Sequence, residues 1–121
     1  MKHTIIHFEI PADDLDRAQK FYSELLGWKI TLTDPSSEYY LIQTGEEGDL
    51  GGGMMKRVHP QQTPVNYIQV ESVEEYSKKA VALGGRVIVP KMAVPTMGYF
   101  AQCLDTEGNV FALWEEDPSA S

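Results

Sequence analysis

The feature of this sequence that most constrains its fold is an alternating pattern near the N-terminus. Apolar Ile6, Phe8 and Ile10 alternate with polar His7 and Glu9. A period of two predicts a β-strand with one apolar face and one face that carries polar side chains. The pattern therefore places His7 and Glu9 together on one side of a sheet.

A helix pattern follows this strand directly. Between residues 15 and 25, apolar side chains recur at spacings of three and four. Asp13 or Asp14 can cap the first turn, and Gly27 stands where the last turn would end. The apolar faces of the strand and the helix can pack on each other, which leaves His7 and Glu9 on the far side of the sheet.

The same strand and helix pattern returns in the second half of the chain. Residues 65–70 have the composition of a strand, and residues 73–83 carry a helical stripe that ends at Gly84. Gly27 and Gly84 are 57 positions apart, and each precedes an apolar strand. The repeat predicts a single domain made of two copies of one module, residues 1–57 and 63–116, joined by residues 58–62.

Each module is predicted to contain one strand, one helix and three further strands. The later strands are expected at 28–33, 38–43 and 50–56, and at 86–89, 99–104 and 110–115. The pattern predicts an α+β fold, two βαβββ modules that form a curved mixed sheet around a cleft, with the helices outside. Residues 90–98 are expected to form a long loop that acts as a lid. Gly51–Gly53 lack the lysine and the helix of a phosphate loop and favour a bend or a close backbone approach.

Composition narrows the function classes. The formal net charge of −8 and the pI near 4.7 disfavour nucleic acid and anionic membrane surfaces as partners. Cys103 is the single cysteine, which excludes an internal disulfide. No apolar run approaches the roughly 20 residues of a membrane helix. We expect a cytoplasmic protein that does not bind a membrane, with disorder confined to residues 119–121.

Several motifs resemble the vicinal oxygen chelate superfamily, which includes glyoxalase I, bleomycin-resistance proteins and extradiol dioxygenases. They are His7 in the first strand, Asp14-Leu15 at the start of the helix, Phe21-Tyr22 and Leu26-Gly27-Trp28 at its end, and Asp105–Asn109 before the last strand. The chain is most similar to the small proteins related to lactoylglutathione lyase. The resemblance implies the glyoxalase-like fold, a small-molecule ligand and a homodimer.

Active members of that superfamily hold a divalent metal through His and Glu side chains of both modules. By this resemblance His7 falls on the first ligand position, or Ile5 if the strand is counted from Ile10. The corresponding place in the second module is Val65, and the Glu of the last strand corresponds to Ala112. Residues 51–55 offer no carboxylate for the remaining position. At most one of the four expected ligands is present, so we expect no resident metal, although a divalent metal stays possible.

His7 therefore has three interpretations: a neutral polar residue in a ligand pocket, a structural histidine, or a metal ligand. Glu9 lies on the same face and could act with His7 in proton transfer, or could lie at the sheet rim paired with a cation. The candidate catalytic residues are His7 and Glu9. The candidate ligand-binding residues, selected for their predicted face or their place beside the lid, are Tyr67, Gln69, Trp114, Tyr99 and Lys91.

Three functions compete at this point. The first is a glyoxalase-like and bleomycin-resistance-like protein that binds a small organic molecule in the cleft between the modules without the usual metal. The second is a divalent-metal-dependent lyase or dioxygenase of the same superfamily with a displaced ligand set. The third is an interaction module whose cleft is filled by side chains. Whether the chain is an enzyme stays open.

Overall fold

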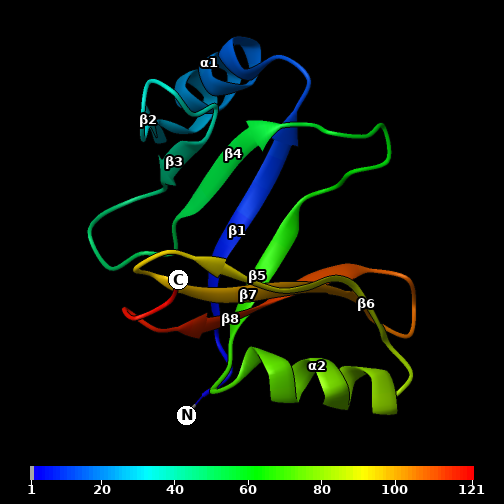
Figure 1. The fold of residues 1–121 in the computed structure, drawn as a ribbon. Helices are drawn as coiled ribbons and strands as arrows, with labels where there is room; N and C mark the ends of the chain where they lie inside the picture. Colours follow the sequence, from blue (N-terminus) through cyan, green and yellow to red (C-terminus); the bar gives the residue numbers. More distant parts are fainter. Residues whose placement is uncertain (1) are drawn as a thin grey trace. The chain divides into compact units, whose positions relative to one another are not determined.

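The computed structural model describes residues 2–121, which fold into two compact units (Figure 1). The N-terminal module comprises His7–Pro64. The C-terminal module comprises Val65–Ser121 together with the short segment that ends at Ile6. That segment belongs to the C-terminal module because the Thr4 carbonyl accepts a hydrogen bond from the Gln69 backbone at 2.9 Å. The repeat predicts two units. The structure differs from that prediction in that the first residues, up to Ile6, belong to the C-terminal module.

The N-terminal module contains β1 (Ile5–Ala12) from His7 onward, α1 (Leu15–Leu26), β2 (Lys29–Leu32), β3 (Tyr40–Gln43) and β4 (Gly52–Lys56). Its strands lie in the order β2-β3-β4-β1. The β2/β3 and β3/β4 pairs are antiparallel, whereas β4 runs parallel to β1. In this register Glu9 lies beside Gly53, and Leu41 lies on the other side of the same glycine.

Local signals set the ends of α1 as the sequence predicts. The Asp14 side chain accepts a hydrogen bond from the Arg17 backbone at 3.0 Å, and Gly27 ends the helix with a left-handed φ of 72°. The helix packs on one face of the sheet through an apolar cluster. Its members are Phe8, Ile10, Ala12, Leu15, Ala18, Tyr22, Trp28, Ile30, Tyr40, Ile42 and Met54.

The C-terminal module repeats this arrangement. It contains β5 (Val65–Gln69), α2 (Val73–Ala82), β6 (Arg86–Val94), β7 (Gly98–Leu104) and β8 (Val110–Glu116). Its strands lie in the order β5-β8-β7-β6, with β8 parallel to β5 and antiparallel to β7. Both modules thus have the βαβββ topology, and the predicted α+β fold class is confirmed.

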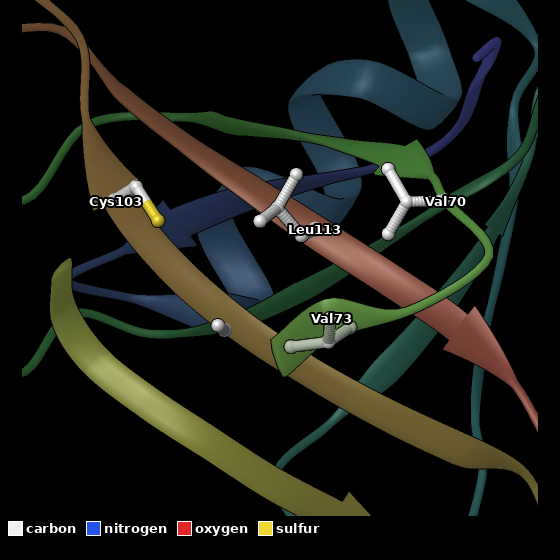
Figure 2. Close-up of a cluster of buried hydrophobic side chains, with 5 residues drawn as sticks. Val70, Val73, Cys103 and Leu113 are labelled. Atoms are coloured by element: carbon white, nitrogen blue, oxygen red, sulfur yellow. The ribbon is translucent and has the colours of Figure 1, made fainter. Parts of the chain in front are cut away.

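The two faces of the C-terminal sheet carry different clusters. On the helix side, Val73 at the start of α2 packs among Val70, Ala101, Cys103 and Leu113 (Figure 2). Alternate residues of the same strands point to the other face. There Val65, Tyr67 and Ala112 are buried, with Phe100, Val110 and Trp114 packed against them.

The prediction of a long lid loop at residues 90–98 is wrong. Strand β6 continues to Val94 because it pairs with β7 through Met92 and Phe100 and closes in a tight turn. Two register shifts, between Val87 and Val89 and between Val89 and Met92, accommodate Pro90, which has no N–H to donate.

The C-terminal segment is ordered, contrary to the expectation of disorder. Ala120 is buried, and its carbonyl accepts a hydrogen bond from the Thr96 backbone at 2.9 Å. The Asp117 backbone donates to the Met97 carbonyl at 3.0 Å. The segment is therefore held against the turn between β6 and β7.

Candidate functional site

A hydrogen-bonded group of three side chains lies on the face of the N-terminal sheet opposite α1. The Tyr39 hydroxyl donates to a carboxylate oxygen of Glu9 at 2.8 Å. The same hydroxyl lies 2.8 Å from Nε2 of His7. All three side chains are half-buried. The alternation in β1 predicted that His7 and Glu9 would share a face, but Tyr39 was not among the predicted site residues.

Gly53 provides the space through which Tyr39 reaches β1. Tyr39 immediately precedes β3, and Gly53 of β4 lies between β3 and β1. A Cβ at Gly53 would lie 1.9 Å from the Tyr39 hydroxyl oxygen. The glycine run predicted a bend or a close backbone approach, and at Gly53 the side chain of Tyr39, just before β3, lies against the backbone. The glycine run was therefore the sequence feature that indicated a close approach at this place, although it did not identify Tyr39 as the approaching residue.

The hydrogen bonds indicate which ring nitrogen of neutral His7 carries the proton. Tyr39 has a single hydroxyl proton, which it donates to Glu9. The contact between His7 and Tyr39 must then use an N–H on Nε2 of the imidazole. In the neutral ring, Nδ1 is accordingly the nitrogen with the lone pair.

Burial and charge act in opposite directions on His7. Burial lowers the pKa of His7 below its ordinary value of 6.5, and the nearby negative charge of Glu9 partly offsets this effect. The net shift is downward, so the imidazole is neutral at pH 7. A neutral histidine that holds a tyrosine beside a carboxylate is suited to proton transfer.

The C-terminal module contains a cavity of about 460 Å³. Gln69 and Trp114, two predicted ligand-binding residues, both line it. The remaining lining residues, Ile6, Thr96, Met97, Glu116 and Pro118, were not predicted. They come from the end of the first segment, the β6–β7 turn, the end of β8 and the C-terminal segment. Hydrophobic periodicity in the sequence does not show that these segments meet.

Trp114 is held in the cavity by a second close approach to a glycine. A Cβ at Gly98 would lie 2.7 Å from the indole ring of Trp114. Tyr67 lies on the same face but is buried, and its hydroxyl accepts a hydrogen bond from the Gln102 amide at 3.4 Å. Tyr67 therefore supports the floor of this face rather than lining the cavity.

Tyr99 and Lys91 lie elsewhere. Tyr99 packs with the cluster on the helix side of the C-terminal sheet, the face opposite Trp114. The Lys91 ammonium lies 4.3 Å from the centre of the Tyr99 ring, a cation–π arrangement. The structure thus brings Gln69 and Trp114 together in the cavity and places Tyr99 and Lys91 together on the other face.

The side chains do not fit the metal that the resemblance implies. Among residues 2–121, no three His, Cys, Asp or Glu side chains form a group that could hold a metal ion. Val65 and Ala112, at two expected ligand positions, are buried hydrocarbon. A bound transition metal needs about three protein ligands. His7 and Glu9 supply two donors, and both are engaged with Tyr39.

Comparison with known proteins agrees with the fold and the motifs. Residues 4–45 match the family model of the bleomycin resistance protein-like N-terminal region. A glyoxylase-like domain-containing protein of Didymella fabae is 30% identical over 112 residues, which cover 87% of this chain and 88% of the relative. CFP32 of Mycobacterium bovis, provisionally named a glyoxylase, is 30% identical over 95% of this chain, but the chain spans only 45% of its length.

A solved structure shows the same fold. A glyoxalase/bleomycin resistance protein/dioxygenase superfamily member from Vibrio splendidus matches with a TM-score of 0.67 and 13% identity, over 96% of this chain and 100% of that one. Two βαβββ modules with this strand order define an α+β protein of the glyoxalase-like class. By its sequence relatives, the chain belongs to the glyoxalase and bleomycin-resistance-like family.

No helix among residues 2–121 combines the length and the apolar character that a membrane crossing requires.

Proposed function

We propose that this chain binds a small organic molecule in the cavity of its C-terminal module, without a resident metal. The observation that carries the proposal is the cavity itself, whose volume of about 460 Å³ falls in the range typical of ligand sites. Its lining combines an aromatic ring and a thioether with an amide and a carboxylate. Few polar groups on an apolar wall are the usual basis of small-molecule recognition.

The lining suggests the chemistry of the ligand. The Trp114 ring offers a flat apolar surface, and its N–H can only donate a hydrogen bond. The Gln69 amide can donate or accept, whereas the Glu116 carboxylate accepts only. A planar, partly polar molecule that carries at least one hydrogen-bond donor fits this set.

The donor set supports the proposal that no metal is needed. A metal-dependent lyase or dioxygenase would need about three side-chain ligands, and no such group forms among the described residues. We therefore favour a binding protein, or an enzyme that works without a metal, over the metal-dependent alternative.

The experiment uses Trp114 as its own reporter. The chain has two tryptophans, and Trp28 is stacked on Tyr22 in the N-terminal module. In a Trp28→Phe background, a library of small planar compounds is screened by Trp114 fluorescence and by thermal shift. We expect at least one compound to change both signals. The absence of any such compound at millimolar concentration would contradict the proposal.

Matched variants then locate the site. Gln69→Ala and Met97→Ala should weaken binding of the compound at least tenfold, because both residues line the cavity. Gln43→Ala and Met92→Ala are the controls, since both residues are exposed and neither lines the cavity. Met97 and Met92 are 59% and 51% exposed, so the two methionine variants have comparable solvation. Equal affinity in all four variants would overturn the assignment to this cavity.

A further inference from the structure

The cavity of the C-terminal module has a lining of one charge sign. Among the described residues that line it, Glu116 is the one charged side chain, and no Lys, Arg or His contributes to the wall. Glu116 lies two positions after Trp114 on β8, and alternation along a strand directs both side chains to the same face. A carboxylate therefore lies on the same face of the sheet as the aromatic ring.

The two acidic residues that flank Glu116 have partners within the module, whereas Glu116 forms no ion pair. The Glu115 carboxylate accepts a hydrogen bond from the Val73 backbone at 2.9 Å, at the start of α2. The Asp117 carboxylate accepts one from the Ser119 backbone at 2.9 Å. None of the salt bridges among residues 2–121 uses Glu116. Its carboxylate can therefore pair with a charge that a ligand brings.

The Lys and Arg side chains that follow β5 do not line the cavity. Lys78 and Lys79 form ion pairs along α2, with Glu side chains one helical turn earlier. Lys91 lies over the ring of Tyr99 on the helix side of the sheet. Arg86 begins β6, at the end of that strand remote from the β6–β7 turn. These cations are thus placed where they do not neutralise the cavity wall.

The β6–β7 turn adds hydrogen-bond acceptors to the wall. The Thr96 hydroxyl donates to the Pro95 carbonyl at 2.6 Å, so the hydroxyl oxygen keeps only its lone pairs for a ligand. Thr96 has a left-handed φ of 67°, which is uncommon for a β-branched residue. The hydrogen bond from its backbone N–H to the Ala120 carbonyl, at 2.9 Å, helps to hold it there. The thioether of Met97, the next residue, is a weak acceptor.

We propose that the cavity selects planar organic cations, whose charge pairs with Glu116 and whose ring lies on Trp114. This inference rests on the proposed binding function and adds the charge of the ligand. The face of an aromatic ring attracts a cation, and tryptophan gives the strongest attraction of this kind. The Glu116 carboxylate attracts the same charge and repels an anion. The ligand class is a flat ring system that contains, or is substituted with, a protonated or quaternary nitrogen.

The test compares three planar probes that differ in charge: the cation 1-methylquinolinium, the neutral molecule quinoline and the anion 2-naphthoate. In ¹⁵N-labelled Trp28→Phe protein, Trp114 is the single tryptophan, so its indole N–H gives one NMR signal that reports each titration. At about pH 7.5 and low salt, we expect the cation to bind at least tenfold more tightly than the anion. It should also bind at least threefold more tightly than quinoline. Added salt should weaken binding of the cation, because screening reduces the attraction between charges.

Glu116→Gln removes the charge from the cavity and should weaken binding of the cation at least fivefold, while changing that of quinoline less than twofold. Glu107→Gln is the matched control. Glu107 is exposed and lies in the turn between β7 and β8, at the end of these strands remote from the Gly98 and Glu116 pair. This variant should leave all three affinities within twofold. Circular dichroism confirms that both variants are folded.

Three results would overturn the inference: equal affinity for the three probes, a cation preference that Glu116→Gln leaves unchanged, or an equal loss in Glu116→Gln and Glu107→Gln. Each of them leaves the proposed binding function in place if the probes still bind and Gln69→Ala still weakens them. Failure of every probe and every screened compound to bind would contradict both the inference and the proposed function.

Discussion

The hydroxyl oxygen of Tyr39 lies 1.9 Å from the position that a Cβ of residue 53 would occupy. Any side chain at residue 53 would therefore compete with Tyr39 for the same space. The hydrogen bonds that join Tyr39 to His7 and to Glu9 can form because β4 carries a glycine at that point. One backbone position thus controls a contact between residues of two other segments.

Gly53→Ala should destabilise the protein by about 1–3 kcal/mol, because the Tyr39 side chain must leave its place and two hydrogen bonds are lost. Urea unfolding measures this change in the free energy of unfolding. In a Tyr39→Ala background the same substitution should cost much less, since the competing atoms are absent. Equal costs in both backgrounds would show that Gly53 and Tyr39 are not coupled.

Stability should fall as the pH drops below the ordinary pKa of histidine. The pKa of His7 in the folded protein lies below 6.5, so between that lowered value and 6.5 the unfolded chain binds more protons than the folded one. Urea unfolding at a series of pH values from about 7.5 to about 5 should show this loss. His7→Gln should reduce it, whereas His59→Gln, in an exposed position, should leave it unchanged.

The charge of Glu9 raises the pKa of His7 against the larger effect of burial. Glu9→Gln removes that charge and should lower the pKa of His7 further. Proton NMR titration of the His7 ring measures the shift, with His7→Gln for assignment. A higher pKa in Glu9→Gln would mean that the carboxylate does not act on the imidazole as the geometry indicates.

The dialysed protein should contain well under one transition metal per chain, and a chelator should leave its thermal midpoint unchanged. The reason is that Val65 and Ala112 offer only hydrocarbon where the resemblance calls for donors. Elemental analysis by mass spectrometry provides the measurement, and the protein should show no metal-dependent lactoylglutathione lyase activity. One tightly held metal per chain that is lost in His7→Ala or Glu9→Ala would support the metal-dependent alternative instead.

Cys103 should react with a thiol reagent only when the C-terminal module opens. Its side chain is fully buried in the cluster with Val70, Val73 and Leu113 (Figure 2), and burial raises the pKa of the thiol. The reaction rate with an aromatic disulfide reagent should therefore increase with added urea and follow unfolding. A fast reaction in the native protein would contradict the packing described for this cluster.

Local signals predicted much of the fold. The caps at Asp14 and Gly27 act within a few residues, so sequence alone places the ends of α1. The alternation in β1 likewise assigns His7 and Glu9 to one face. The strand that replaces the expected lid was not predictable in this way, because Pro90 breaks the pattern and the pairing partner of β6 is supplied by β7.

The candidate site was predicted only in part, because strand pairing brings some of its residues together. Tyr39 joins Glu9 and His7 across 30 and 32 positions of sequence, and the contact depends on strand register rather than on periodicity. Gln69 and Trp114 were found because alternation places them on one face of adjacent strands. Tyr99 was selected for its place beside a lid, but alternation within β7 directs it to the helix side. The predicted homodimer stays a prediction that sedimentation can test.

The order of the C-terminal segment has a consequence for how ligand binding can be detected. Pro118 forms part of the cavity wall, and the segment is attached through Ala120 and Asp117 to the β6–β7 turn. A carboxypeptidase must release these contacts before it can trim past the exposed Ser121. A compound bound in the cavity would oppose that release, so the rate of trimming would itself report occupancy without any label on protein or ligand.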